Sequence, residues 1–244
     1  MSGIFIPFNL KPNVAMTGKK IIFLLMVISA GTAGFSQIYT RPNYGIKSHE
    51  TLEINRIEVT EQNTVIYLSI ENKITGGYFC TDKRTYLIYP DGTRMRMTRA
   101  AGIPYCPELH KFYSVGEKLH FELIFPPLSP GTKWIDMVEQ CGGNCYWVYG
   151  IILDNEPNRR LDEVFRITSS GRPEENILVF RQLLGEVDSL NSGIEGMLYY
   201  NIINAALEAG DTIEAGVWYK RLSESDAPRK EQYLKLLNDR GIKF

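Results

Sequence analysis

Apolar and polar residues alternate in short runs between residues 52 and 153, and turn residues separate the runs. This pattern is typical of β-strands that bury one face. In residues 65–70, for example, Ile66, Leu68 and Ile70 fall on one face of a strand. The same pattern predicts further strands at 84–89, 93–98, 119–125, 134–138 and 146–153.

Turn residues mark where these strands end. Pro90, Asp91 and Gly92 separate two alternating runs and predict a hairpin turn. Pro126 and Pro127 end a third run. The number of runs, about seven or eight, is that of an immunoglobulin-like sandwich. We therefore expect an antiparallel β-sandwich domain at 51–154, preceded by a lead-in at 37–50.

The hydrophobic period changes to that of helices after residue 172. The segment 155–172 contains Pro157 and Gly171 and breaks the alternation, so we expect it to be a linker. Pro173 then begins a helix with two acidic residues in its first turn. The sequence thus predicts an α+β protein whose two types of structure lie in separate domains, with a small α-helical domain at 173–244.

A helical hairpin is expected within that domain. One helix runs from about residue 194 to Gly210, and a capping box at 211–214 opens the next. A last helix begins near Pro228 and ends at Gly241.

This hairpin resembles one tetratricopeptide repeat unit. The residues that carry the resemblance are Tyr199, Gly210, Asp211, Ala215, Tyr219 and Pro228. In that family they form the tight turn and fill the space between the helices, and Leu222 and Ala206 depart from the pattern. The resemblance implies binding of a peptide or partner protein, although an array needs about three units. A helical hairpin that only packs against its neighbours is the alternative.

The N-terminus has the layout of a secretory signal peptide. Lys19 and Lys20 precede an apolar run at 21–30, and small residues lead to a cleavage position between Ser36 and Gln37. We expect Met16 to be the true start, with 1–15 a mis-called extension. The apolar run is shorter than the roughly 20 residues that span a bilayer. The first cysteine is Cys80, which argues against a lipoprotein anchor, so we expect a protein of the bacterial periplasm or the extracellular space.

Charge argues against nucleic acid as a partner. Three of the 27 Lys and Arg lie in residues 1–36, which hold no Asp or Glu. The remaining chain therefore carries 24 basic and 28 acidic side chains, a net charge of −4. Phosphate binding needs clustered positive charge, which this sequence lacks.

The four cysteines, Cys80, Cys106, Cys141 and Cys145, allow three disulfide connectivities. Export favours pairing, and the glycine-rich stretch between Cys141 and Cys145 favours joining those two and therefore Cys80 with Cys106. A redox-active dithiol at Cys141 and Cys145 is an alternative, disfavoured because three residues separate them and no helix follows. The irregular spacing also disfavours a zinc site.

No other constellation indicates catalysis. His49, His110 and His120 lack the spacing of metal ligands, and no nucleophile elbow, phosphate loop or zinc-protease motif is present. We expect no enzyme activity, no cofactor and no metal.

An aromatic cluster supplies the remaining hypothesis about binding. Trp134, Tyr146, Trp147 and Tyr149 lie in two predicted strands, and exposed aromatics on a sandwich can stack on sugars or anchor a protein. Packing between the sheets is the alternative. The sequence predicts a non-enzymatic exported protein that mediates protein association through an unknown partner. A carbohydrate-binding module and a thiol oxidoreductase are the competing functions.

Overall fold

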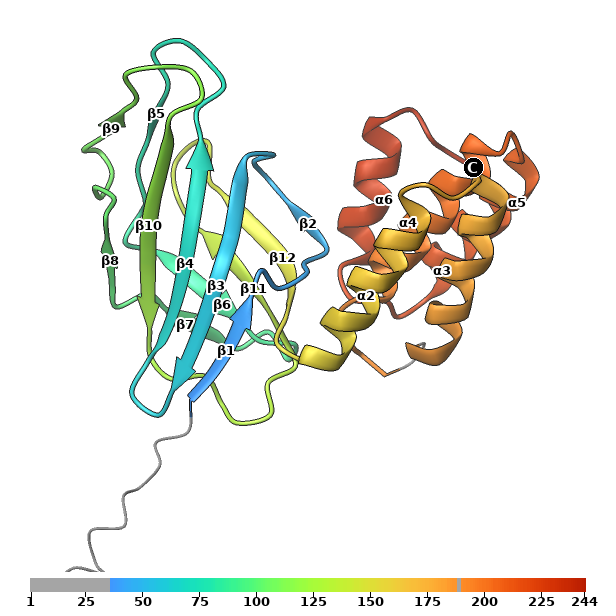
Figure 1. Cartoon of the computed structure of the whole chain (residues 1–244), viewed down its shortest axis with the longest axis horizontal. Coiled ribbons are helices and arrows are strands. Elements are labelled where there is room, and N and C mark those ends of the chain that lie inside the picture. Colours follow the sequence, from blue (N-terminus) through green and yellow to red (C-terminus); the bar gives the residue numbers. More distant parts are fainter. Residues whose placement is uncertain (1–35, 188–189) are drawn as a thin grey trace, which may run out of the picture. The chain divides into compact units, whose positions relative to one another are not determined.

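The computed structural model describes residues 36–187 and 190–244 (Figure 1). The predicted signal peptide lies outside the described residues except for Ser36. The described N-terminal part is built of β-sheets and the C-terminal part of five helices, in agreement with the expected α+β class.

Two five-stranded antiparallel sheets form the β region. Sheet A has the order β1 (Ser36–Thr40), β3 (Leu52–Thr60), β4 (Thr64–Glu71), β10 (Lys118–Phe125), β8 (Arg99–Ala101). Sheet B has the order β2 (Ile46–Lys47), β12 (Trp147–Ile152), β11 (Trp134–Glu139), β6 (Thr85–Ile88), β7 (Arg94–Arg96). A short ribbon pairs β5 (Tyr78–Phe79) with β9 (His110–Lys111).

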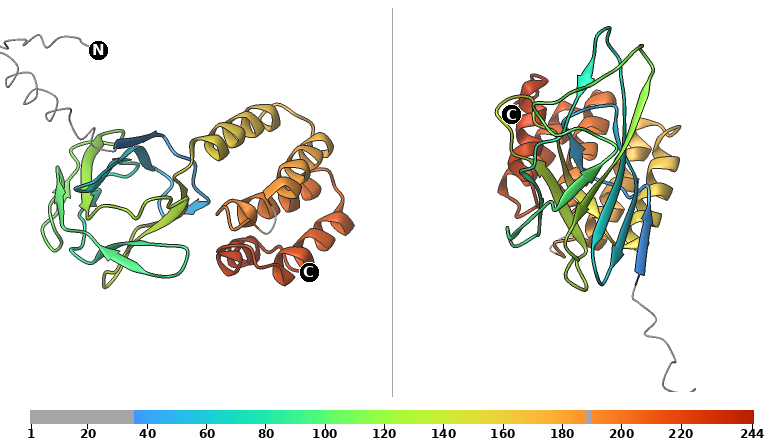
Figure 2. Two further views of the ribbon diagram at one scale, coloured as in Figure 1. Left: turned by 90° about the horizontal axis from the view of Figure 1, so that it is seen from below. Right: turned by 90° about the vertical axis from the view of Figure 1, so that its left-hand side faces the viewer.

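The inner faces of the two sheets share one hydrophobic core. Leu68 and Leu123 of sheet A are buried in the same cluster as Leu87, Met137 and Val148 of sheet B. Each of these residues sits at an alternating position of its strand, so the period of two in the sequence directs the apolar side chains inward. Figure 2 shows the two layers from two further directions.

Five helices follow the last strand. They are α2 (Asn155–Thr168), α3 (Pro173–Val187), α4 (Glu195–Glu208), α5 (Thr212–Glu224) and α6 (Lys230–Asp239). Consecutive helices contact one another along the chain (Figure 2). The predicted capping box is present at α5, where the Asp211 carboxylate accepts the backbone N–H of Glu214 at 2.8 Å. Helices α3 to α6 occupy the segments where the sequence predicts helices.

Helix α2 corrects the expectation of a linker at 155–172. Its N-cap is Asp154, whose side chain accepts the N–H of Glu156 at 3.1 Å. Pro157 is accommodated because it lies in the first turn, where a helix makes no use of the missing N–H. Leu161 is the one fully buried side chain of α2, with Val164 and Phe165 partly buried beside it. Polar and charged residues make up most of the helix, so it reads as a linker in the sequence.

The helices pack on the outer face of sheet B. Trp134 of β11 and Ile152 of β12 belong to the hydrophobic cluster of the helices instead of the sandwich core. The indole Nε1–H of Trp134 donates to the carbonyl oxygen of Asn191 at 3.0 Å. Tyr233 of α6 is buried, and its hydroxyl lies against the backbone of Gly45, before β2.

A buried ion pair joins the same two layers. Asp136 of β11 is fully buried and accepts the N–H of Gly150 at 2.7 Å. Its other carboxylate oxygen pairs with the guanidinium of Arg229, the N-cap residue of α6. The Arg229 guanidinium also lies 5.1 Å from the ring centroid of Tyr149. Removing one partner of such a pair costs about 3–5 kcal/mol, because the other charge stays buried.

The packing of Trp134 against Gly193 gives a test of this interface. Gly193 has φ +86°, and a Cβ there would lie 2.6 Å from the Trp134 ring. We expect Gly193→Ala to lower the free energy of unfolding by about 1–2 kcal/mol, because a residue with a Cβ atom is disfavoured at a left-handed φ. An overpacking cost of about 1–3 kcal/mol adds to this loss, because the new methyl group collides with the indole. Urea unfolding measures the sum of the two costs.

The matched control is Gly92→Ala, which carries the backbone cost without the collision. Gly92 has φ +85° and no neighbour within 4 Å of its Cβ position. The difference between the two variants in urea unfolding therefore isolates the overpacking cost. Equal losses of stability in the two variants would contradict the close packing of Gly193 on Trp134.

Candidate functional site

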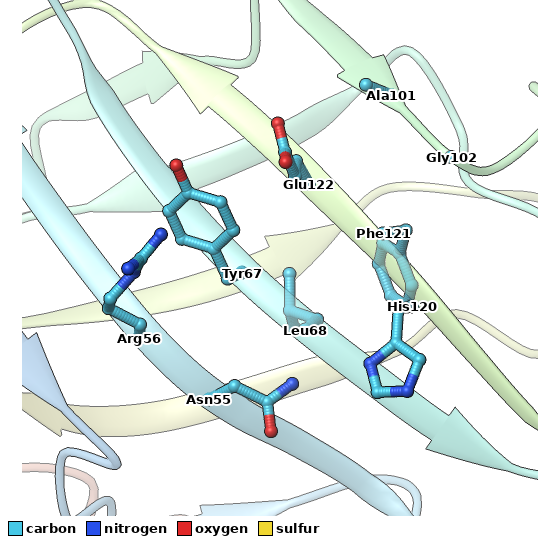
Figure 3. Close-up of a pocket in the computed structure, with 9 residues that line it drawn as sticks. All are labelled: Asn55, Arg56, Tyr67, Leu68, Ala101, Gly102, His120, Phe121 and Glu122. Carbon is cyan, nitrogen blue, oxygen red and sulfur yellow. The ribbon is translucent and has the colours of Figure 1, made fainter.

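The outer face of sheet A carries a shallow hollow of about 460 Å³, here named the sheet A groove (Figure 3). The residues that line it are Asn55, Arg56, Tyr67, Leu68, Ala101, Gly102, His120, Phe121 and Glu122. They come from β3, β4 and β10 and from the end of β8.

Cross-strand register places three side chains of the groove in one row. Arg56 and Glu122 are the partners of Tyr67 on the two neighbouring strands. The Arg56 guanidinium lies 4.2 Å from the centroid of the Tyr67 ring. The Tyr67 hydroxyl donates to Glu58 at 3.0 Å, and burial together with this acceptor raises the pKa of Tyr67. The row is therefore fixed by contacts within the sheet.

A β-bulge widens the groove at β3. The register with β4 shifts between Ile54 and Arg56, so that both Asn55 and Arg56 avoid the core. The Asn55 amide donates to the Ser69 hydroxyl at 3.1 Å. His120 is exposed and lies opposite Ser69 on β10. The sequence signal of this arrangement is the pair of consecutive polar residues in an otherwise alternating strand.

A second surface lies on two helices and is named the α3–α5 surface. It comprises Arg181, Ile213, Val217, Trp218 and Arg221, and its hollow measures about 370 Å³. Ile213 is 81% exposed and Val217 47%. These two aliphatic side chains lie one turn apart on α5 and form an exposed apolar ridge beside the hollow.

Trp218 forms the centre of the α3–α5 surface. Its ring is buried beneath the guanidinium groups of Arg221 and Arg181, whose carbons lie 4.5 Å and 5.5 Å from the ring centroid. The indole N–H donates to Glu214 at 3.1 Å, and Arg181 pairs with the same carboxylate at 3.4 Å. Glu214 therefore holds both the ring and one arginine in place.

The four cysteines form the pairing that the sequence favours, Cys80–Cys106 and Cys141–Cys145. Both disulfides border one pocket of about 600 Å³, here named the disulfide pocket. Its wall includes His49, Asp82 and Glu139. The sequence gives no indication that the two disulfides border one pocket, because this depends on how β5, β9 and β11 are placed.

Glu139 is a buried acid beside one of these disulfides. A carboxylate oxygen of Glu139 and the Sγ atoms of Cys141 and Cys145 all lie within 4.8 Å of one another. Its two oxygens accept the backbone N–H groups of Asp82 at 2.6 Å and Tyr146 at 3.2 Å. Burial raises the pKa of Glu139 and outweighs these two donors, which lower it.

The structure divides the predicted aromatic cluster. Trp134 is buried under the helices and Tyr146 lies in the sandwich core, so neither offers a ring to a surface ligand. Trp147 and Tyr149 are half-buried and stack at 4.6 Å between centroids. Trp134 is buried because helices cover the outer face of sheet B, whereas Tyr146 packs between the sheets, as the alternative interpretation had it.

The residues of the predicted helical hairpin pack as follows. Tyr199 is buried with its ring 5.9 Å from that of Trp218, and Ala215 is fully buried. Gly210 lies between α4 and α5, and the Tyr219 hydroxyl donates to Asn238 at 3.0 Å.

The three histidines lie in different surroundings within the β region. His49 borders the disulfide pocket, and burial lowers its pKa. His110 lies 3.6 Å from Glu117, and His120 lies in the sheet A groove.

Comparison of the chain with models of known protein families finds no match, and comparison with curated proteins finds no significant match either. Among residues 36–187 and 190–244, no helix is both long enough and apolar enough to cross a bilayer. The candidate surfaces therefore rest on their own geometry.

The raised pKa of Glu139 predicts a pH dependence of stability. An acid whose pKa is raised by folding stabilises the fold below its usual value of 4.5 and loses this contribution as the pH rises through the folded value. We expect the free energy of unfolding of the wild type, relative to Glu139→Gln, to fall as the pH is raised from about 4 to about 8. Urea unfolding at several pH values measures the difference.

The control for this measurement is Glu50→Gln, because Glu50 is exposed and makes no ion pair among the described residues. This substitution should leave the free energy of unfolding unchanged. A difference between wild type and Glu139→Gln that stays constant with pH would show that Glu139 is not held in a raised-pKa state.

Proposed function

We propose that this chain is an exported protein that associates with another protein at the bacterial cell envelope or outside the cell, and that this association is non-enzymatic. The observation that carries the proposal is the α3–α5 surface, where exposed aliphatic side chains surround a tryptophan covered by two arginines. Tryptophan and arginine are the residue types that most often dominate protein interfaces.

The rigidity of this surface supports a role in recognition. Trp218 and Arg181 are both held by Glu214, so little side-chain freedom is lost when a partner binds. Ile213 and Val217 lie one turn apart on α5 and present an apolar ridge. Association itself requires no catalytic group.

Charge indicates the chemistry of the partner. Arg181 is neutralised by Glu214, whereas Arg221 makes no ion pair among the described residues. An apolar side chain flanked by a carboxylate would cover the ridge and pair with Arg221. We therefore propose a partner protein that presents an acidic and apolar segment.

The fold and location belong to the same proposal. An immunoglobulin-like sandwich joined to a tetratricopeptide-like hairpin would suit a binding protein. The two disulfides and the lack of a helix able to cross a bilayer in the described part are compatible with export.

Substitution of the apolar ridge tests the association. We expect Ile213→Glu combined with Val217→Glu to weaken capture of a cross-linked partner from envelope extracts roughly 30-fold, because hot-spot truncations cost about 2 kcal/mol or more. Quantitative cross-linking followed by mass spectrometry gives the measurement.

The control is Val115→Glu, which changes a valine that is 57% exposed on the β region and lies outside the disulfide pocket. Capture should survive this change. A partner retained equally by all variants, or no reproducible partner at all, would overturn the assignment of the α3–α5 surface.

A specific observation favours glycan binding as a second candidate function. The sheet A groove combines the Tyr67 ring with amide, imidazole and carboxylate groups from Asn55, His120 and Glu122. Arg56 is paired with Glu58 at 3.1 Å, which lowers the net charge offered to a ligand. Such an open, hydrogen-bonding surface suits a neutral polyhydroxyl chain.

Titration of the mature protein with neutral soluble polysaccharides tests the sheet A groove. We expect Tyr67→Ala to weaken binding about tenfold, because an aromatic contact is worth about 1.4 kcal/mol. Calorimetry measures the affinity. Tyr113→Ala is the control, since Tyr113 is 96% exposed and lies outside the groove. Flat titrations across the panel would eliminate this candidate.

A further inference from the structure

The disulfide pocket contains a short-loop disulfide, a buried acid and an open approach in one place. Cys141–Cys145 closes a sequence separation of four residues, and Gly142, Gly143 and Asn144 between them are exposed. Cys141 borders the pocket. An incoming thiol can therefore approach this disulfide from solvent.

The two sulfur atoms have different surroundings. The backbone N–H of Cys141 is directed at Cys145 Sγ, at a distance of 3.1 Å. A donor so placed stabilises negative charge on that sulfur. The carbonyl oxygen of Gly143 lies 3.5 Å from the same sulfur and can accept its S–H once it is protonated. We therefore assign Cys145 as the leaving sulfur and Cys141, which borders the pocket, as the sulfur that is attacked.

We propose that Cys141–Cys145 exchanges with cysteine thiols of a client protein, with Glu139 as the proton donor to the leaving sulfur. This activity goes beyond association and does not depend on the α3–α5 surface.

The exchange balances in two steps. A client thiolate attacks Cys141 Sγ, which breaks the Cys141–Cys145 bond and forms a mixed disulfide. Cys145 leaves as a thiolate and takes a proton from Glu139. A second client thiolate then attacks the client sulfur of the mixed disulfide and releases Cys141. The client gains a disulfide and loses two electrons, and the Cys141/Cys145 pair gains them. A low-molecular-weight disulfide restores the oxidised pair and is itself reduced to two thiols.

The surroundings favour Glu139 as the proton donor. Its carboxyl group lies within 4.8 Å of both sulfur atoms, and burial raises its pKa. The other titratable groups that face it or share its pocket are Asp82, Tyr146, His49, Glu71, Lys73 and Tyr78. The negative charge of Asp82 raises the pKa of Glu139, as burial does.

The other disulfide supplies an internal control. Cys80–Cys106 closes a longer loop, with a sequence separation of 26, and borders the same pocket. Reduced glutathione is added to the native mature protein, and the thiols that appear are alkylated and located by mass spectrometry. We expect Cys141–Cys145 to open at least about tenfold faster than Cys80–Cys106. Equal rates, or resistance until denaturant is added, would overturn the proposal.

The role of Glu139 is tested by the exchange rate of the wild type divided by that of Glu139→Gln, measured at several pH values. Ionisation of glutathione affects both proteins equally and cancels in the ratio. We expect a ratio of roughly 100 at low pH that falls towards one as Glu139 ionises. A ratio that does not change with pH would eliminate Glu139 as the donor. Glu50→Gln should exchange like the wild type.

The assignment of the two sulfurs is tested by trapping the mixed disulfide. Reduced glutathione is added to the wild type, the reaction is quenched with acid, and the position of the glutathione adduct is located by peptide mass spectrometry. We expect the adduct on Cys141, which borders the pocket. An adduct mainly on Cys145 would reverse the assignment and contradict the proposed direction of attack.

Discussion

The buried ion pair of Asp136 and Arg229 is the constraint on which the arrangement of this chain depends. Asp136 points out of sheet B, where a carboxylate without a partner would be costly once helices cover it. Arg229 meets it from the start of α6. The helices therefore have one favourable position on sheet B, with Trp134 and Tyr233 filling the space around the pair.

Covering one sheet determines which surfaces remain for binding. The outer face of sheet B is occupied by α-helices through Trp134 and Ile152, whereas the outer face of sheet A holds the groove around Tyr67. The same packing buries the inner sides of α4 and α5 and leaves Ile213 and Val217 exposed. The candidate binding surfaces of this molecule are thus consequences of where the helices meet the sandwich.

Local signals explain which elements could be predicted. The capping residue Asp211 and the turn at Gly210 act within a few residues of themselves, so helix boundaries were accessible from the sequence. Helix α2 was missed because Leu161 is its one fully buried side chain. The bulge at Asn55 had a local signal, yet its partners Ser69 and His120 lie on other strands, so the groove was not predictable.

By itself the sequence determined strands β4, β6, β7, β10, β11 and β12, four of the five helices and the favoured cysteine pairing, because alternation, helix caps and short loops are properties of neighbouring residues. It did not predict β1 and β2, which lie, apart from Ser36, in the segment 37–50 expected to be a lead-in. The tertiary structure alone decided the rest. It buried Trp134 and Tyr146, which the sequence offers as surface aromatics, and it brought Glu139 to Cys141 and Cys145 inside one pocket with Cys80–Cys106. Burial and contact between distant strands depend on how the layers pack, and no local pattern encodes that packing.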